Sequence, residues 1–189
     1  MEPEHPVVVP YRPSWAVEAD DLIALLQGEL GDLAVRIDHI GSTAIPGMAS
    51  KNVFDLQVSV EDLHVASSGK PLLEALGFEL SPIEADHVPA ARLDDPALWS
   101  KRLWLRRLEG ATDVNLHIRR AGSPNERLAL LFRDWFRAHS EAVDAYGAFK
   151  LALSQACRDL GTYVGTKDSI VDVIVVAAEE WASVVNWRP

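Results

Sequence analysis

A Gly-Ser pair followed by an acidic residue has the residue types best suited to chemistry in this sequence. Gly41 and Ser42 follow a short β-type stretch, and Asp55 lies in the next one. A glycine lets the backbone come close to a phosphate, while hydroxyls and free N–H groups bind anions. A carboxylate can hold the divalent metal ion that phosphoryl and nucleotidyl transfer require, because negative charge builds up on the phosphate oxygens. These residues predict a phosphate site at Gly41, Ser42 and Thr43 beside a metal ion.

The polar face of two predicted strands supplies the other catalytic candidates. Asp55 and Gln57 alternate along one strand, so their side chains lie on one face. The second arm of a predicted hairpin places Asn115 and His117 on its polar face. If that arm lies beside the first strand, the four side chains form one polar floor. We therefore predict Asp55 and Gln57 as ligands of Mg²⁺ or Mn²⁺, and His117 as a further ligand or an acid–base group.

Ordinary structural roles are the alternatives for the same residues. Gly41 and Ser42 also suit a common tight turn, and Asp55 could instead cap a turn or pair with a lysine. A histidine within a strand is more often structural than catalytic, although the neighbours of His117 on its face are Asn115 and an arginine. The sequence alone leaves these alternatives open.

Basic residues in the second half of the chain recur at helical spacing. Arg133 and Arg137 are four residues apart and so share a helix face, while Lys150 and Lys167 each follow a tyrosine by four residues. If the helices pack over the polar face of the sheet, basic side chains line a pocket for a nucleotide or another phosphate-bearing small molecule. The residues expected to line it are Lys51, Arg133, Lys150 and Lys167. Otherwise Arg133 pairs with a glutamate and the lysines stay in water.

Hydrophobic periodicity and turn signals define the elements that must position these residues. The predicted elements are a helix at 15–30, strands at 35–40 and 53–60, a helix at 63–76, a strand at 77–80, a loop at 84–98, hairpin arms at 101–108 and 112–119, and helices at 124–138, at 140–160 and from 166 onward. We predict an α+β fold in a single domain, with a small mixed sheet backed by helices at 1–120 and a three-helix portion at 121–189 packed beside it.

Capping signals set the expected ends of the helices. Ser14 is a candidate N-cap of the first helix. Ser123 and Glu126 form a capping box, with a proline at the first helical position. Gly161 is expected to end the second C-terminal helix, and Thr166 is expected to cap the third.

The composition excludes several classes of function. Of the 189 residues, 48% are hydrophobic and 24% are charged, and the net charge is -10, so we expect no non-specific binding to nucleic acid or to an anionic membrane surface. Cys157 is the single cysteine, which rules out an intrachain disulfide and is typical of a cytoplasmic protein. We find no signal pattern, no apolar run that approaches a membrane span and no P-loop motif.

The sequence resembles the GrpB family, a branch of the nucleotidyltransferase-fold superfamily. The similarity covers most of the chain and rests on HIGSTAIPGMASKNVFDLQVSV at 39–60, NLHI at 115–118, LLFRDWFRAH at 130–139, YGAFK at 146–150 and YVGTK at 163–167. The resemblance implies a nucleotidyltransferase-like mixed sheet with the Gly-Ser signature of the superfamily, and a helical C-terminal half. Similar domains occur joined to dephospho-coenzyme A kinases.

Active members of that superfamily carry a Gly-Ser pair, two acidic residues at alternate positions of a strand, and a third acidic residue on an adjacent strand. Gly41, Ser42 and Asp55 match this pattern. Gln57 stands where the second carboxylate is expected, and His117 or its face neighbour stands near the third. These departures argue against two-metal catalysis.

Three hypotheses about function are compatible with these observations. The first is a nucleotidyltransferase that moves a nucleotidyl group from a nucleoside triphosphate to a small acceptor, with one metal ion on Asp55. The second is a catalytically inactive module that binds a nucleotide or phosphate in the same pocket. The third is another reaction, such as hydrolysis, at a metal site of Asp55 and His117. A metal requirement for binding and turnover of a nucleotide distinguish the first hypothesis from the second.

Overall fold

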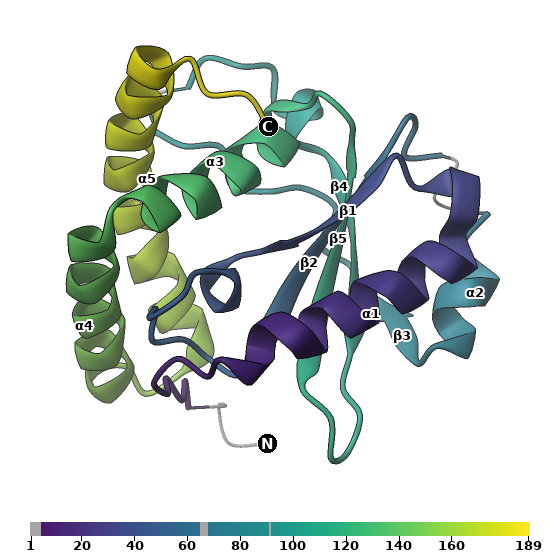
Figure 1. The fold of residues 1–189 in the computed structure, drawn as a ribbon, viewed down its shortest axis with the longest axis horizontal. Coiled ribbons are helices and arrows are strands. Elements are labelled where there is room, and N and C mark those ends of the chain that lie inside the picture. The colour runs from purple at the N-terminus through teal and green to yellow at the C-terminus, as the bar shows by residue number, and fades with distance from the viewer. Residues whose placement is uncertain (1–4, 65–67, 91) are drawn as a thin grey trace.

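A five-stranded mixed β-sheet lies at the centre of the fold (Figure 1). We describe residues 5–64, 68–90 and 92–189 of a computed structural model. The strands are β1 (Arg36–Ile40), β2 (Val53–Val60), β3 (Phe78–Leu80), β4 (Lys101–Arg106) and β5 (Asp113–Arg120), in the spatial order β1-β2-β5-β4-β3. β2 and β5 pair in parallel, and the other neighbouring strands pair antiparallel. The predicted mixed sheet, including the hairpin of β4 and β5, is confirmed.

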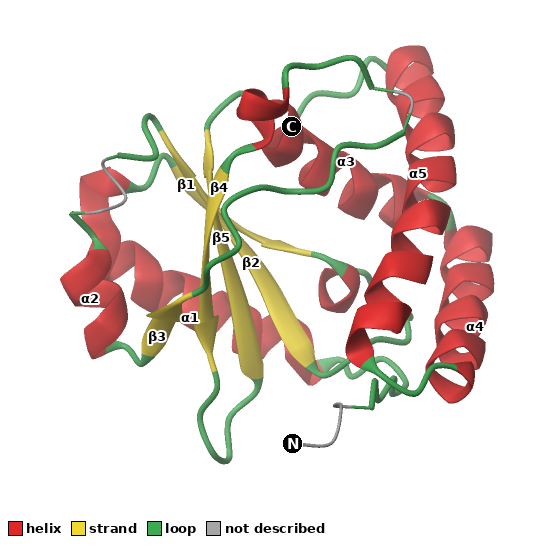
Figure 2. Cartoon of the chain, turned by 180° about the vertical axis from the view of Figure 1, so that it is seen from behind, coloured by secondary structure: helices red, strands yellow, loops and turns green. Residues whose placement is uncertain are grey.

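The helices form two groups on either side of this sheet (Figure 2). They are α1 (Ser14–Leu30), α2 (Lys70–Ala75), α3 (Pro124–Ala138), α4 (Ser140–Ala156) and α5 (Leu160–Val185). α1 and α2 share an apolar core with the sheet, whereas α3, α4 and α5 lie together beside it (Figures 1 and 2). This arrangement is the predicted α+β fold with a C-terminal helical portion.

Strand alternation separates the main core from the polar face of the sheet. On β2, Phe54, Leu56 and Val58 are buried in one cluster with Trp15 and Leu26 of α1. Because successive side chains of a strand point to opposite faces, the residues between them face the other side of the sheet. The apolar stripe predicted on the first helix therefore packs as expected, and β2 presents its polar side chains toward the C-terminal helices.

The segment after β1 is held by the helical part of the chain. Ile45 and Met48, both fully buried, belong to one cluster with Phe136 of α3 and Tyr146 of α4. The rings of Phe136 and Tyr146 stack with their centres 5.2 Å apart. This packing fixes the segment that carries the Gly-Ser pair between the sheet and the helices.

Four helix ends differ from the prediction: the starts of α1, α2 and α5 and the end of α4. Ser14 is the first residue of α1, and Pro13 occupies the N-cap position. The helix predicted at 63–76 is observed as α2, which is shorter and occupies Lys70–Ala75. Residues 65–67 of the predicted span lie outside the described part of the chain. Gly161 and Thr166 both lie inside α5.

The early start of α5 has a local cause. The carboxylate of Asp159 accepts hydrogen bonds from the backbone N–H and from the hydroxyl of Thr162, each at 2.8 Å. A side-chain acceptor at the N-cap satisfies one of the N–H groups that a helix start leaves without an intrahelical partner. Asp159 therefore begins α5 at Leu160, so Gly161 lies in the first turn of that helix, and the preceding helix α4 already ends at Ala156.

The predicted capping box of α3 makes a different set of contacts. The Ser123 hydroxyl oxygen lies 2.6 Å from the carbonyl oxygen of Arg120 and 2.7 Å from Asn125 Oδ1, to one of which it donates its single proton, and it accepts no backbone N–H of the first turn of the helix. The Glu126 carboxylate accepts from the Ser59 hydroxyl of β2 at 2.7 Å and from the backbone N–H of Gly122 at 3.1 Å. Glu126 thus fastens the start of α3 to the sheet.

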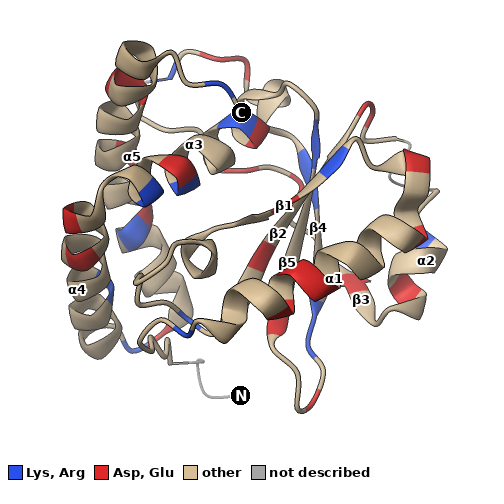
Figure 3. Ribbon diagram, viewed as in Figure 1, with Lys and Arg blue, Asp and Glu red and all other residues tan. Residues whose placement is uncertain are grey.

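Acidic and basic residues occur on both helices and strands but are unevenly distributed (Figure 3): β4 carries Lys101, Arg102 and Arg106 and no acidic residue, whereas α1 carries acidic residues and no basic one. None of the helices within the described ranges combines the length and the apolar character needed to cross a membrane.

The turn after β1 depends on glycine. β1 ends at Ile40, which pairs with Asp55 of β2, and Gly41 follows with φ +68°. A Cβ atom added to Gly41 would collide with the Asp55 carboxylate. Glycine avoids both this collision and the cost of a left-handed backbone conformation. The close approach holds the Gly-Ser pair against Asp55.

We expect Leu56→Ala to lower the free energy of unfolding by about 3 kcal/mol, because Leu56 is 0% exposed and its loss leaves a cavity. Val184→Ala, at a side chain 80% exposed, is the control and should change it by less than about 0.5 kcal/mol. Urea denaturation measures both values. Equal losses would contradict the core assignment.

A second pair of variants isolates the approach of Gly41 to Asp55. Gly110 also has positive φ, +76°, but a Cβ atom there meets nothing within 4 Å. Gly110→Ala should therefore cost about 1–2 kcal/mol for the backbone alone. Gly41→Ala should cost clearly more in the same denaturation measurement, because the added methyl group also displaces the carboxylate. A smaller loss at Gly41 than at Gly110 would show that the turn does not press on Asp55.

Candidate functional site

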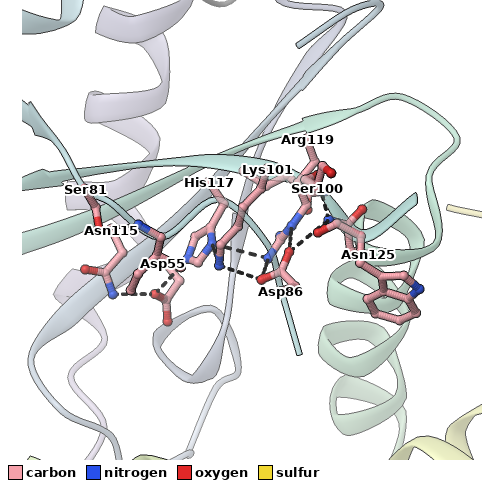
Figure 4. A network of polar contacts seen from close by, with 12 residues as sticks. Asp55, Ser81, Asp86, Ser100, Lys101, Asn115, His117, Arg119 and Asn125 are labelled. Atoms are coloured by element: carbon pink, nitrogen blue, oxygen red, sulfur yellow. Dashed lines mark hydrogen bonds and ion pairs between the residues drawn. The ribbon is translucent and has the colours of Figure 1, made fainter. Parts of the chain in front are cut away.

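The predicted polar floor forms where β2 and β5 pair. Asp55 lies opposite Asn115, and Gln57 lies opposite His117 in the parallel register. The Asn115 amide donates to Asp55 Oδ1 at 2.9 Å, and His117 Nε2 lies 3.5 Å from the same oxygen (Figure 4). The Asp55 side chain is 33% exposed and that of His117 is 13% exposed. The register therefore presents an accessible carboxylate with two neutral side chains beside it.

A cavity of about 520 Å³ lies between this floor and α3, α4 and α5. It brings together seven of the predicted site residues, which contribute to its wall. They are Gly41, Ser42, Lys51, Asp55, His117, Lys150 and Lys167. Apolar side chains complete the wall on the side of α3 and α5, among them Phe132 and Val171. The expectation that the helical part packs over the polar face of the sheet is confirmed by these lining residues.

Lys150 is the most unusual group in the cavity. It is 2% exposed, and its ammonium group donates to the Ser42 hydroxyl at 2.8 Å. The same nitrogen lies 5.0 Å from the centre of the Tyr146 ring. No carboxylate within the described ranges forms an ion pair with it, although buried lysines are seldom left without one. Burial, together with the charges of Lys167 and Lys51, lowers the pKa of Lys150 to about 7.

Two further lysines lie near the same end of the cavity. Lys51 Nζ lies 5.8 Å from the centre of the Tyr163 ring. Lys167 Nζ lies 3.6 Å from Asp168, and its side chain is 28% exposed. We refer to Lys51, Lys150 and Lys167 as the lysine cluster. Its positive charges repel one another, which is the electrostatic character of an anion-binding site.

Gln57 and Thr43 do not face the cavity, contrary to the prediction. Gln57 is 0% exposed, with its carbonyl oxygen accepting from Arg119 at 2.6 Å and its amide donating to the backbone carbonyl of Glu126 at 3.3 Å. Thr43 is 1% exposed, and its hydroxyl lies 2.9 Å from His39 Nε2. The polar groups of both side chains form hydrogen bonds within the protein, because Gln57 is covered by the start of α3 and Thr43 is buried in the turn after β1.

Arg133 is also placed outside the cavity. Its guanidinium pairs with Asp134 at 2.7 Å and with Asp38 of β1 at 3.4 Å, and it donates to the carbonyl of His39 at 3.2 Å. An ion pair was the alternative stated for this residue, but its partners are two aspartates and not a glutamate. The reason is its position on α3, which turns it toward the β1 edge of the sheet.

A carboxylate that the sequence analysis did not select lies at the other end of the floor. Asp86 accepts from Lys101 Nζ at 2.6 Å, from the Arg119 guanidinium at 2.8 and 3.0 Å, and from the Asn125 amide at 2.9 Å (Figure 4). Burial would raise the pKa of Asp86, but Arg119 and Lys101 hold it far below its usual range. Asp86 lies in the aperiodic stretch 84–98, where no pattern distinguishes one acid from another. The available signal was Arg119, a cation on the polar face that needed a carboxylate.

The contacts of His117 fix its tautomer. Its Nδ1 lies 3.3 Å from Lys101 Nζ and 3.3 Å from Arg119 Nη2. A lysine ammonium and an arginine guanidinium only donate, so Nδ1 accepts and the proton resides on Nε2, facing Asp55. Burial and then Arg119 lower the pKa of His117, so the ring is neutral at pH 7. His117 thus donates a hydrogen bond from Nε2 to Asp55. Its ring has no free lone pair on the side that faces this carboxylate.

Asp55 stays ionised in this environment. Burial would raise its pKa, but the hydrogen bond from His117, the Asn115 amide and the charge of Lys51 lower it to about 2. Its Oδ1 receives the two donors from β5, while no hydrogen bond from the described residues reaches Oδ2. The cavity therefore contains a permanent negative charge with one unused acceptor.

The donor set around Asp55 does not fit a protein-built Mg²⁺ or Mn²⁺ site. Such ions take about six oxygen ligands, usually including one or two carboxylates. The described ranges contain no group of three histidine, cysteine or acidic side chains able to hold a metal ion. Gln57 faces away, and Asn115 Oδ1 accepts from Arg107 at 2.6 Å. Of the two predicted metal ligands, Asp55 therefore lies on the cavity wall without Gln57 beside it.

Comparison with known proteins gives the family. The model of the family described as GrpB protein matches residues 5–176. A protein from Mycolicibacterium paratuberculosis named Dephospho-CoA kinase is 37% identical over 96% of this chain and 48% of its own length, so the chain spans about half of such relatives. A UPF0157 protein from Halalkalibacterium halodurans is 31% identical over 89% of this chain and 80% of its own length.

Solved structures add a likeness of fold. The crystal structure of conserved protein GrpB from Enterococcus faecalis superposes with a TM-score of 0.74 at 24% identity, covering 93% of this chain and 99% of that one. A weaker overlap, with a TM-score of 0.48 at 14% identity over 76% of this chain and 41% of the other, is found with Cid1 in complex with its short product ApU, and it carries no argument about activity. The family model spans nearly the whole chain, with the Gly-Ser turn, Asp55 and the lysine cluster inside the matched region, and the chain therefore belongs to the GrpB family.

Proposed function

We propose that the cavity binds a phosphate-bearing small molecule, such as a nucleotide, and that this binding needs no divalent metal ion. The observation that carries the proposal is Lys150, an amine 2% exposed that lacks a carboxylate partner within the described part of the chain. Burying an unpaired ammonium costs several kcal/mol, and an anionic ligand would offset that cost. The site is thus electrostatically incomplete without an anion.

Ser42 supports the same proposal through its hydrogen-bonding capacity. Its hydroxyl oxygen accepts from Lys150 at 2.8 Å, which leaves the hydroxyl proton to donate to a phosphate oxygen. Gly41 beside it carries no side chain that could cover the turn, and both residues line the cavity. Lys51 and Lys167 supply further positive charge at the same end. The phosphate would therefore lie against the Gly-Ser turn.

Nucleotidyl transfer with one metal ion on Asp55 is the second candidate. The observation in its favour is that Gly41, Ser42 and Asp55 share the cavity wall, with Asp55 ionised and one third exposed. A bound nucleotide could add phosphate ligands to a magnesium ion that the protein holds with one carboxylate. This candidate requires both metal-dependent binding and turnover, and it is rejected if purified protein releases no pyrophosphate from any nucleoside triphosphate with Mg²⁺ or Mn²⁺.

Calorimetry with ATP, GTP, CTP and UTP in the presence of EDTA tests the first proposal. We expect binding of at least one of them, and Lys150→Met should weaken it about tenfold or more, since a charge-assisted hydrogen bond is lost. Lys70→Met is the matched control, because Lys70 is exposed on α2 and pairs with Glu74. Absence of heat with all four nucleotides in EDTA, together with binding once Mg²⁺ is added, would favour the second candidate.

The affinity for an anion should fall as the pH rises. The pKa of Lys150 is lowered to about 7, so the group is mostly charged at about pH 6 and mostly neutral at about pH 8. An anion favours the charged form, so binding draws a proton onto Lys150 and weakens about tenfold between these two pH values. Sulfate, which keeps its charge across this range, is the probe for calorimetry. A pH-independent affinity, or the same slope in Lys150→Met, would contradict this assignment.

A further inference from the structure

The Asp55 carboxylate needs an explanation that anion binding does not provide. Asp55 lies on the wall of the cavity with its side chain 33% exposed, and it would repel a phosphate bound by the lysine cluster. Its Oδ1 is engaged by Asn115 and His117, which fix the orientation of the whole group. Its Oδ2 receives no hydrogen bond from the described residues. The carboxylate is thus held in place with one acceptor left for a ligand.

The Gly-Ser turn sets how far this acceptor lies from the anion site. Gly41 is in contact with the Asp55 carboxylate on one side of the turn. Ser42, the next residue, accepts the hydrogen bond from Lys150. Two adjacent residues therefore separate the negative group from the buried positive one. A ligand that contacts both must carry its own positive and negative groups only a few bonds apart.

We infer that the ligand is an ammonium-bearing phosphate ester, whose phosphate contacts the lysine cluster and whose ammonium contacts Asp55. This inference rests on the proposed phosphate binding and adds the chemical class of the ligand. One carboxylate oxygen is sufficient for an ammonium group, which donates hydrogen bonds and carries a single charge. A divalent metal ion at the same place would have Asp55 as its one carboxylate ligand, since the described ranges contain no group of three histidine, cysteine or acidic side chains that could hold it. The ligand would therefore supply from its own structure the cation that Asp55 faces.

Three small ligands of similar size test the inference with the full chain in EDTA. They are 2-aminoethyl phosphate, 2-hydroxyethyl phosphate and ethyl phosphate, and their dissociation constants can be measured by calorimetry or NMR titration. We expect 2-aminoethyl phosphate to bind about tenfold more tightly than the other two, the gain typical of a hydrogen bond between charged groups. Asp55→Asn should abolish that difference and leave ethyl phosphate bound at least as well. Asp113→Asn, on the same sheet but outside the cavity, should preserve it.

The possible outcomes distinguish failure of the ammonium site from failure of the proposed phosphate binding. Equal affinities for the three ligands in the unmodified protein would overturn the ammonium site and leave phosphate binding intact. Equal affinity for the amino and hydroxyl compounds, with weaker binding of ethyl phosphate, would also overturn it, because a neutral donor would suffice. Failure of all three ligands, of the nucleotides and of sulfate to bind would remove the phosphate site as well. Tighter binding of ethyl phosphate with Mg²⁺, lost in Asp55→Asn, would assign the carboxylate to a metal ion instead.

Discussion

The parallel pairing of β2 with β5 is the constraint on which the rest of the site depends. It places Asp55 beside Asn115 and Gln57 beside His117, and the alternation along both strands sends the apolar residues to the opposite face. A shift of one residue would exchange the two faces and bury the carboxylate in the main core. The apolar cluster with α1 therefore fixes the polar floor as firmly as any contact within the floor.

The charged side chains around the cavity fall into two groups, those that are paired within the described part of the protein and those that are not. Asp86, Lys101 and Arg119 neutralise one another through short hydrogen bonds, and their side chains are at most 17% exposed. A network of this kind is satisfied by the protein itself and stabilises one arrangement of the strands and the segment before β4. Lys150 and Asp55 differ from this network, because each lines the cavity and keeps hydrogen-bonding capacity that the described residues do not use. The contrast separates the structural half of the floor from the half that is available to a ligand.

Much of this could be predicted from sequence because the signals are local. The alternation in β2 and β5 and the helical spacing of α3 and α4 follow from periodicity, and they were sufficient to bring Asp55, His117 and Lys150 to one site. Partners far apart in the chain were not predictable in this way. Asp86 lies in an aperiodic segment, and its partners become visible only once the sheet is assembled.

The residues placed wrongly have a common physical cause. Gln57 alternates correctly with Asp55, but Arg119 and the start of α3 cover it. Arg133 lies on the predicted helix, but the pairing with Asp38 and Asp134 turns it toward the edge of the sheet. Periodicity gives the face of an element, whereas the neighbour that occupies this face depends on the packing of other elements. Competition between partners for the same side chain is therefore what a single sequence does not reveal.

The fastening of α3 to β2 has a mechanical consequence. Glu126 accepts from the Ser59 hydroxyl through its carboxylate, and its backbone carbonyl accepts from the Gln57 amide, all within the buried interior. Rotating the helical half away from the sheet would leave these groups without hydrogen-bond partners, at a free-energy cost of about 1–3 kcal/mol for each group. A hinge between α3 and β2 is therefore disfavoured, and these two elements would keep their arrangement when a ligand enters. The wall that they contribute to the cavity is thus a stiff frame.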